Sequence, residues 1–255
     1  MRYAIISDIH ANLPALRAVL TDIDKREDVD AIYHLGDLTG YAPWPNEVVA
    51  TLIERGIVGI AGNYDSTIAT DYKHCGCRAE TERDEELSHL SYEWTLARVT
   101  ANTKAYLARL PFRLDLRPLG GHAVGPTITL VHGNQTLNTV YVTEDRPDSF
   151  LEKMAAGIGA RTGDMICFGH THQPWQREVA GIRFLNAGSV GRPKDGDWRA
   201  CYAILTIENS GIRGEFVRVS YGVETAARAI IESELPNEFA SVLRLGGAAA
   251  LSTQS

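Results

Sequence analysis

Two histidines that stand two positions apart, His170 and His172, follow an apolar run at residues 164–168. Only 8 of the 255 residues are histidines, so a close pair needs an explanation. Taken alone, the pair fits an exposed polar loop as well as it fits a metal site. Four other apolar runs also end in turns with side chains that can bind metal ions. These side chains are Asp8, His10, Asp37, Asn63 and His132.

Together the side chains offer seven oxygen or nitrogen donors, which are too many for one ion and suit two. Hydrolases with two metal ions hold them about 3.5–4 Å apart, which requires a shared carboxylate, and Asp37 is the natural bridge. Two divalent cations outweigh the charges of Asp8 and Asp37 even with a bridging hydroxide, so the centre would attract an anionic ester. Carboxylate, imidazole and amide donors without a thiolate favour Mn²⁺, with Fe, Zn²⁺ or Ni²⁺ as alternatives.

The elements that would position these donors follow one another as strand, helix, strand, helix and strand. Apolar runs predict the strands and amphipathic patterns predict the helices, at residues 2–7, 13–26, 30–35, 46–55 and 56–61. This order is typical of an α/β fold with a parallel sheet and right-handed connections.

Parallel strands place their carboxyl ends at the same edge of a sheet, where ligands gather. We therefore expect the seven donors to converge at that edge. The alternative is that Asp and Asn follow strands because they favour turns. That alternative is adequate for Asp37 or Asn63 alone, but not for five strand ends that carry four histidines.

The rest of the chain is expected to add a helical insertion, at about residues 66–110, and a second sheet. Further strands and a helix lead up to the histidine pair, at residues 112–116, 127–131 and 147–158. Later strand-like pieces are predicted to form a second, mixed sheet, at residues 175–179, 183–185, 201–207 and 214–219. We expect a single domain over residues 1–235, followed by a helical or frayed tail at residues 236–255.

The composition is typical of a globular protein without a general surface for nucleic acid or membranes. Hydrophobic residues make up 44% of the chain, charged residues 22%, and the net charge is −7. This acidic balance argues against a broad basic surface for DNA or anionic lipids. No apolar run reaches the roughly 18 residues of a membrane span, and no signal-peptide pattern begins the chain, so we expect a cytoplasmic location.

The four cysteines divide into two kinds. Cys167 and Cys201 lie inside apolar runs and are expected to be core thiols. Cys75 and Cys77 lie in a polar segment whose spacing differs from the usual zinc pattern and which lacks a second half. A pair of loop thiols is therefore favoured over a second metal site.

The motifs resemble those of the calcineurin-like metallophosphoesterase superfamily. The matching segments occur in the family's order: Asp8-Ile9-His10, Gly36-Asp37, Gly62-Asn63, His132 and Gly169-His170-Thr171-His172. The segment at residues 186–191 is similar to a family segment as well. The chain looks most like the small single-domain bacterial and archaeal phosphoesterases. The resemblance implies an α/β fold in which a two-sheet β-sandwich is flanked by helices, a four-layer αββα arrangement.

The resemblance also implies a role for each donor. The first ion would be held by Asp8, His10 and His172, and the second by Asn63, His132 and His170. Asp37 would bridge the ions, and Asp37 and His132 would count among the catalytic residues. A hydroxide between the ions would attack phosphorus in line, opposite the leaving alkoxide. The implied activity is therefore hydrolysis of phosphate esters, by a phosphatase or a phosphodiesterase.

One position departs from the family pattern. Many members have a histidine directly after the Gly-Asn pair, which contacts the phosphate or protonates the leaving group, and here that residue is Tyr64. A phenol with an ordinary pKa near 10 is a poorer acid than an imidazole. Diesters, or esters with good leaving groups, are therefore favoured over ordinary monoesters. The alternative is that Tyr64 is a wall of the cleft without a chemical role.

Asn12 and Arg192 are weaker candidates, for substrate binding. Asn12 could touch the phosphate, although capping of the following helix explains it equally well. Arg192 could clamp a phosphate oxygen, although an exposed loop is the more common setting. Tyr41 could line the cleft and Asp65 could orient a ligand, with surface packing and a turn as their alternatives.

Two other functions compete with hydrolysis. A protein-binding scaffold on the same fold, of the kind found in the retromer sorting subunit, should have lost ligands, whereas all seven are present here. A nuclease for long DNA would need a nucleic-acid module, which this acidic chain lacks. We therefore expect a small phosphate ester or diester as substrate and two divalent metal ions as cofactors. A homo-oligomer stays an open alternative to a monomer.

Overall fold

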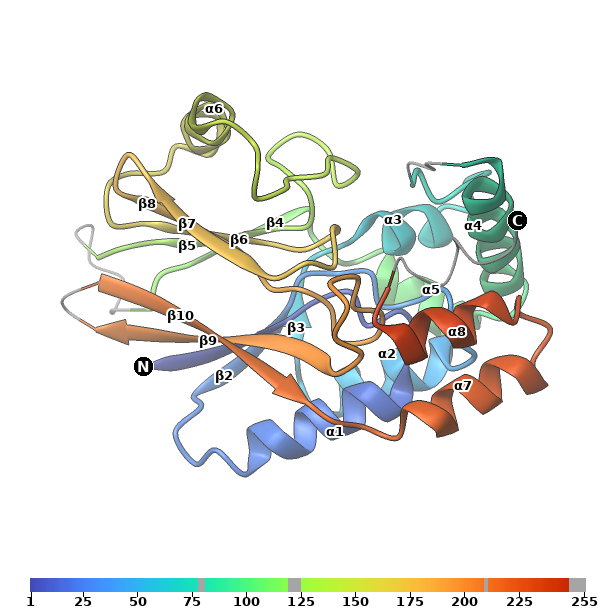
Figure 1. The fold of residues 1–255 in the computed structure, drawn as a ribbon. Helices are drawn as coiled ribbons and strands as arrows, with labels where there is room; N and C mark the ends of the chain where they lie inside the picture. The colour runs from blue at the N-terminus through green and yellow to red at the C-terminus, as the bar shows by residue number, and fades with distance from the viewer. Residues whose placement is uncertain (78–80, 119–124, 209–210, 248–255) are drawn as a thin grey trace.

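The computed structural model describes residues 1–77, 81–118, 125–208 and 211–247. Two five-stranded sheets stack face to face, with helices on both outer sides (Figure 1). This confirms the sandwich flanked by helices. The first sheet has the order β10-β9-β1-β2-β3. Its strands are β1 (Arg2–Ile6), β2 (Ala31–His34), β3 (Val58–Gly59), β9 (Ala200–Glu208) and β10 (Gly211–Val219).

The second sheet has the order β4-β5-β6-β8-β7. Its strands are β4 (Arg113–Leu116), β5 (Ile128–Val131), β6 (Met165–Phe168), β7 (Trp175–Val179) and β8 (Ile182–Asn186). The second sheet has a parallel centre with one antiparallel strand at each margin, whereas in the first sheet the parallel strands lie on one side and the antiparallel hairpin of β9 and β10 on the other. β1, β2 and β3 run parallel, as do β5, β6 and β8. These two sets of parallel strands include all the strands that end in candidate ligands.

Seven of the eight described helices are associated with the first sheet, and α6 (Asp148–Ile158) packs on the second. In Figure 1, α6 lies above the second sheet while α1 and α7 lie below the first. The other seven helices are α1 (Leu13–Asp24), α2 (Pro45–Glu54), α3 (Asn63–Ala69), α4 (Glu82–Leu96), α5 (Ala101–Leu107), α7 (Val223–Glu232) and α8 (Glu238–Leu245). No helix in the described ranges combines the length and apolar character that a membrane crossing requires.

The central strands are apolar on both faces because each face is covered. In β1, Ile5 points into the layer between the sheets, whereas Ala4 and Ile6 point toward the helices. In β6, Cys167 belongs to the inter-sheet layer and Phe168 to the layer beneath α6. Burial on both faces removes the alternation of apolar and polar residues, which explains the continuous apolar runs.

The sequence-based assignment of strands to sheets was wrong in part. Residues 201–207 and 214–219 were expected in the second sheet, but β9 pairs antiparallel with β1, and β10 pairs with β9. Conversely, β5 and β6 belong to the second sheet and not to the sheet of β1. An antiparallel hairpin can extend either sheet, and its own sequence does not specify which. Because β5 and β6 belong to the second sheet, the donors come from two sheets and not from one edge of a single sheet.

The last part of the chain contributes to the core. Helix α7 was not predicted, and α8 occupies residues assigned to the tail. Phe239, Ala240 and Leu243 of α8 are buried in the same apolar cluster as α1. The segment expected as a helical insertion holds α4 and α5, and α3 already begins at Asn63. Residues 248–255 of the expected tail lie outside the described part.

The inter-sheet layer should be a main source of stability. Ile5 is fully buried on the central strand of the first sheet, so Ile5→Ala leaves a cavity between the sheets. We expect the free energy of unfolding in urea to fall by about 3 kcal/mol. The matched control is Ile53→Ala on α2, where the side chain is 52% exposed, and its effect should stay within about 0.5 kcal/mol. Equal effects of the two variants would contradict this account of the core.

Candidate metal centre

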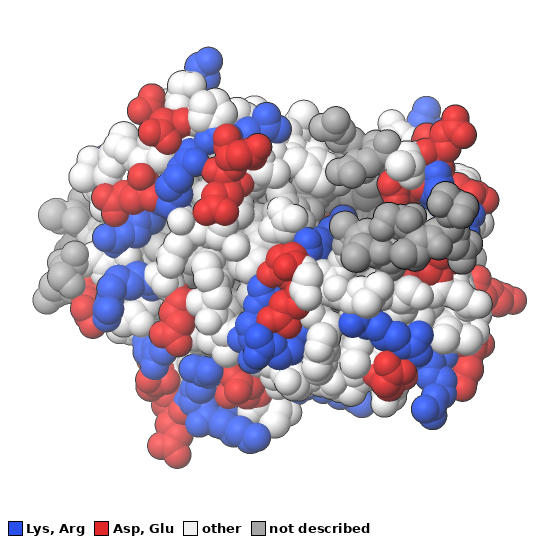
Figure 2. Space-filling model, in the orientation of Figure 1, with Lys and Arg blue, Asp and Glu red and all other residues white. Residues whose placement is uncertain are grey.

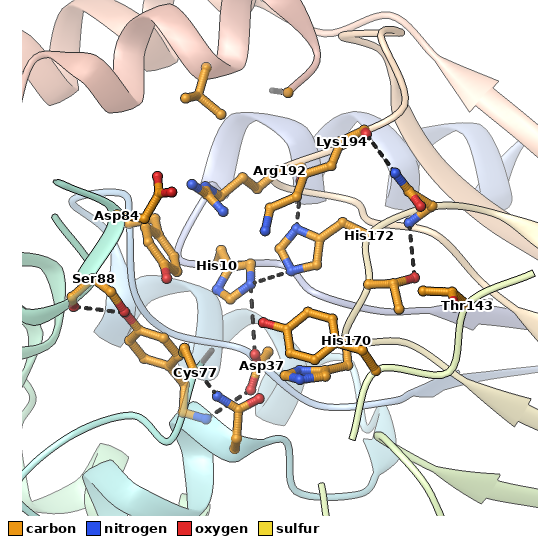
Figure 3. Close-up of a pocket in the computed structure, with 18 of the residues that line it drawn as sticks. His10, Asp37, Cys77, Asp84, Ser88, Thr143, His170, His172, Arg192 and Lys194 are labelled. Atoms are coloured by element: carbon orange, nitrogen blue, oxygen red, sulfur yellow. Dashed lines mark hydrogen bonds and ion pairs between the residues drawn. The ribbon is translucent and has the colours of Figure 1, made fainter. Parts of the chain in front are cut away.

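The seven donors meet at one end of the sandwich, where the carboxyl ends of five strands come together. Each donor follows its strand within a few residues, and all seven are buried. Figure 3 shows His10, Asp37, His170 and His172 directed toward one another at the bottom of a cavity. The convergence expected from the sequence is therefore present in the structure, although the contributing strands belong to two sheets.

The donors form two groups with close ligand atoms. In each group the ligand atoms lie within 4.8 Å of one another, and the groups are Asp8, His10 and His172, and Asp37, His132 and His170. Asn63 adjoins the second group, with its Oδ1 atom 3.1 Å from His132 Nε2. The Oδ2 atom of Asp37 lies 3.7 Å from His10 Nε2 and 3.5 Å from His132 Nε2, between the two groups.

Three of the histidines are oriented by backbone carbonyl groups. The Nδ1 atom of His10 lies 3.0 Å from Thr39 O, and that of His132 lies 2.7 Å from Leu35 O. His172 Nδ1 lies 2.7 Å from the carbonyl oxygen of Arg192. Because a carbonyl oxygen can only accept, each Nδ1 carries the hydrogen of the neutral ring. The lone pair of each Nε2 is then directed into the centre, as in metal sites.

The two carboxylates are each fixed through one oxygen. Asp8 Oδ2 accepts hydrogen bonds from Ser7 Oγ at 2.6 Å and from the His170 backbone N–H at 3.1 Å. Asp8 Oδ1 is buried and accepts none from the described residues. Asp37 Oδ1 accepts from the Tyr64 backbone N–H at 2.9 Å, which leaves Oδ2 toward the centre. Buried acceptors without partners are rare, so a cation is a natural occupant.

Asn63 is anchored by the segment that carries the unusual cysteine pair. Its Nδ2 atom donates to the Cys75 carbonyl oxygen at 3.0 Å and lies 3.4 Å from Cys77 Sγ, so Oδ1 faces His132. The two cysteine sulfurs are joined as a disulfide, so neither supplies a thiolate to a metal site. The segment instead fixes the orientation of the Asn63 amide.

The backbone at the centre is strained. Five of the seven donors have positive φ angles: Asp8 at 51°, His10 at 47°, Asp37 at 52°, His170 at 67° and His172 at 61°. Residues with a Cβ atom adopt this left-handed region at a cost, and such residues cluster at functional sites. These backbone conformations direct donors that are close in sequence, such as His170 and His172, toward a common point. A regular strand or helix would not do so.

Asp65 holds the loops that carry two of the donors. Its carboxylate accepts hydrogen bonds from the backbone N–H groups of Asp37 at 2.8 Å, Leu38 at 3.0 Å and Gly62 at 2.9 Å. A Cβ atom on Gly62 would come within 2.1 Å of Asp37 Oδ1, so this close approach requires glycine. Burial and the neighbouring Asp37 raise the pKa of Asp65 to about 7.

The charges of the centre are strongly coupled. Burial alone would lower the pKa of His132, but the carboxylates of Asp37 and Asp8 raise it to about 9. Burial would raise the pKa of Asp37, but His132, His10 and His170 bring it below its ordinary value. Burial lowers the pKa of His10 and of His170 to about 3. At neutral pH these two rings are therefore neutral, which is the form that binds metals.

A large cavity of about 670 Å³ opens above the centre. Its wall includes residues that the sequence reasoning missed, because no motif or spacing marks them. They are Tyr141, whose ring lies 4.2 Å from that of His170 between centroids, and Arg146, Lys194 and Phe239. Phe239 comes from α8, in the part of the chain that was expected to be a tail. Only the folded arrangement brings these residues to the cavity.

Tyr64 lines the cavity, but its hydroxyl group does not face the candidate ligands. The hydroxyl lies 3.2 Å from Ser91 Oγ and 3.5 Å from the Ser88 carbonyl oxygen, both on α4. Burial raises the pKa of this phenol well above 10. The expected catalytic and substrate-binding roles of Tyr64 therefore lack a geometric basis, and the geometry favours the alternative of a cleft wall.

Asn12 does not reach the cavity. It is fully buried, its Oδ1 atom accepts from the Ala15 N–H at 3.2 Å as the cap of α1, and its Nδ2 donates to Gly191 O at 2.9 Å. We therefore do not assign Asn12 to substrate binding. Arg192 does line the cavity, with its guanidinium Cζ atom 4.1 Å from the centroid of the Tyr41 ring.

The raised pKa of His132 predicts how protons and metal ions compete. In metal-free protein at about pH 7.5 we expect His132 to be an imidazolium while His10 and His170 are neutral. Long-range ¹H–¹⁵N spectra can measure this, with His132→Asn to assign the signal. Zn²⁺ should convert the ring to its neutral form, and metal affinity should fall as the pH drops below about 9. A neutral His132 ring in the metal-free protein at about pH 7.5 would contradict the predicted coupling to Asp37 and Asp8.

Comparison with protein families agrees with these motifs. A family model described as the calcineurin-like phosphoesterase superfamily domain matches residues 1–210. The uncharacterized protein MJ0912 of Methanocaldococcus jannaschii is 28% identical over 260 residues, which cover 95% of this chain and 97% of the relative.

Solved structures share the fold over nearly the whole chain. A metallophosphoesterase from Sphaerobacter thermophilus is 29% identical, with a TM-score of 0.73 and coverage of 96% of this chain and 99% of that one. The hypothetical protein PH1004 of Pyrococcus horikoshii OT3 is 24% identical, with a TM-score of 0.79 and coverage of 97% and 99%. The motifs, the fold and the family match agree, and the chain belongs to the calcineurin-like phosphoesterase superfamily.

Proposed function

We propose that the protein is a metal-dependent phosphoric ester hydrolase that cleaves a small phosphodiester, or a monoester with a good leaving group. The observation that carries the proposal is the position of Asp37 Oδ2, 3.7 Å from His10 Nε2 and 3.5 Å from His132 Nε2. One carboxylate oxygen thus lies between two groups of ligand atoms that face inward. Membership of a superfamily of phosphoesterases supports the same activity.

When bound, two divalent ions supply a hydroxide nucleophile and positive charge for the phosphoryl oxygens. The chain's own part is to hold the ligand atoms in place before the substrate arrives. We assign Asp8, His10 and His172 to the first ion, Asn63, His132 and His170 to the second, and Asp37 to both. The donor set favours Mn²⁺, with Fe, Zn²⁺ or Ni²⁺ as alternatives.

The preference for good leaving groups follows from the position of Tyr64. Its hydroxyl group is engaged with α4, and its raised pKa makes it a poor proton donor to a leaving alkoxide. An aryl oxide or a stabilised alkoxide can leave without such a proton. An ordinary phosphomonoester, whose alkoxide is a strong base, would need an acid that Tyr64 does not supply.

A small substrate fits the shape and charge of the molecule. The cavity is closed below by the centre and has about the size of a small-molecule pocket. Acidic and basic side chains are intermingled over the face in Figure 2, which is unlike the basic stripe that long duplexes require. A cytoplasmic location belongs to the same proposal.

Removal of the shared carboxylate charge tests the proposal. Asp37→Asn should lose most of its affinity for both ions and at least about a hundredfold in kcat toward an activated aryl phosphodiester. Metal content by mass spectrometry and turnover with Mn²⁺, Fe²⁺, Zn²⁺ and Ni²⁺ are the measurements. The matched control is Asp28→Asn, which changes a loop carboxylate whose side chain is 58% exposed. The metal content and kcat of this variant should equal those of the wild type.

The possible outcomes separate the two functions. Two tightly bound ions in Asp37→Asn would refute the bridging role. A wild-type protein that binds two ions but hydrolyses no ester with any of the four metals would refute the hydrolase and favour the protein-binding scaffold.

The hydroxyl group of Tyr64 should be dispensable for turnover. Tyr64→Phe removes only the contact with Ser91 and Ser88, so we expect kcat for the diester to change by less than about threefold. The free energy of unfolding should fall by about 1 kcal/mol for the lost hydrogen bond. A decrease in kcat of a hundredfold at unchanged metal content would return Tyr64 to the chemistry.

A further inference from the structure

Two basic residues from one loop line the cavity beside the candidate centre. Arg192 and Lys194 extend over His172 toward the cavity in Figure 3. The carbonyl oxygen of Arg192 lies 2.7 Å from His172 Nδ1, so the loop that carries both charges is fixed against the first group of ligands.

The guanidinium group of Arg192 is held in position by aromatic rings. Its Cζ atom lies 4.1 Å from the ring centroid of Tyr41 and 5.9 Å from that of Phe239. The two rings contact each other edge to face, with 5.1 Å between centroids. A planar guanidinium on such a support loses little conformational freedom when it binds a ligand, and its geometry matches phosphate oxygens.

In the part of the chain that the structure describes, no nearby carboxylate balances the charge of Arg192. No carboxylate in the described ranges lies within 4.0 Å of its guanidinium nitrogens, and Nε is buried without a hydrogen-bond partner there. Asp84 also lines the cavity, but it comes from α4 and accepts a hydrogen bond from Thr81. Arg192 is half-buried, and a partly desolvated cation without a counter-charge is stabilised by an anion, so we expect this group to meet one from the ligand.

We propose that Arg192, with Lys194 beside it, forms a second phosphate-binding subsite, and that the substrate is a phosphate ester that carries a further phosphate group. This inference rests on the proposed hydrolase function of the centre. The phosphate that is cleaved would bind at the metal centre, which the seven donors would hold, and Arg192 would bind the phosphate that is not cleaved. Nucleoside bisphosphates and nucleoside polyphosphates have this chemistry.

The cavity has room for such a substrate. Its volume of about 670 Å³ falls within the range of roughly 300–1,000 Å³ that small-molecule sites occupy. A simple phosphate ester would fill only the part next to the centre. The Tyr41 ring lies 4.9 Å from the His10 ring between centroids, so the guanidinium site adjoins the first group of ligands, and the organic group that joins two phosphates would occupy the rest of the cavity.

A pair of chromogenic esters tests the subsite. Thymidine 5′-(p-nitrophenyl phosphate) and its 3′-phosphorylated form share the scissile bond and the leaving group, and differ only in the second phosphate. With manganese-loaded protein we expect kcat/KM to be about tenfold higher or more for the phosphorylated ester. In Arg192→Met, which keeps an apolar chain against Tyr41, the ratio of the two kcat/KM values should approach one.

Two further variants complete the design. Arg192→Lys keeps the charge without the planar fork and should keep part of the ratio. Arg213→Met removes an arginine of β10 whose side chain is 73% exposed and does not line the cavity, so the ratio should equal that of the wild type. Equal kcat/KM values for both esters in the wild type, or an unchanged ratio in Arg192→Met, would overturn the proposal.

Binding separates this inference from the hydrolase function. Calorimetry on the manganese-loaded protein should give about tenfold tighter binding for thymidine 3′,5′-bisphosphate than for thymidine 5′-phosphate, and Arg192→Met should abolish the difference. If neither ester is hydrolysed, the hydrolase fails while this difference still supports the subsite. Equal affinities of the wild type for the two nucleotides would refute the subsite even in an active enzyme.

Discussion

The structure depends on compensating the free-energy cost of burying two carboxylates and four imidazoles together. Asp8, Asp37 and the histidines are nearly inaccessible to water, and such groups are stable only when charges and hydrogen bonds compensate one another. In the metal-free protein, the pair of Asp37 and protonated His132 provides part of this compensation. The oxygens and nitrogens that stay unsatisfied, Asp8 Oδ1 and His170 Nε2, point to where cations would complete it.

A surrounding layer of hydrogen bonds fixes the ligands. Carbonyl groups orient three histidine rings, Ser7 and the backbone of Tyr64 each hold one carboxylate oxygen, and Asp65 ties the loops after β2 and β3 together. These contacts hold five donors in a strained backbone conformation, which the rigid sandwich can sustain. The same layer also explains why Tyr64 is buried. Its backbone N–H donates a hydrogen bond to Asp37, while its side chain packs against α4.

Local patterns in the sequence were sufficient for the strands and for the convergence of the donors. Each apolar run ends where a donor begins, and turn chemistry marks that point. The partners of β9 could not be inferred, because pairing depends on contacts between residues far apart in the chain. Asn12 was ambiguous, since capping and phosphate binding use the same amide, and only its contact with Gly191 decides. Phe239 and Tyr141 carry no motif, so their place at the cavity depends on the fold alone.

The division of the ligands between the sheets couples the centre to the fold. In the first group, Asp8 and His10 follow β1 of the first sheet, whereas His172 follows β6 of the second. The second group likewise combines Asp37 from the first sheet with His132 and His170 from the second. Each bound ion would therefore join the two sheets at the end of the apolar layer between them. Because ions that bind only the folded state stabilise it, metal binding and the packing of the sandwich should reinforce each other.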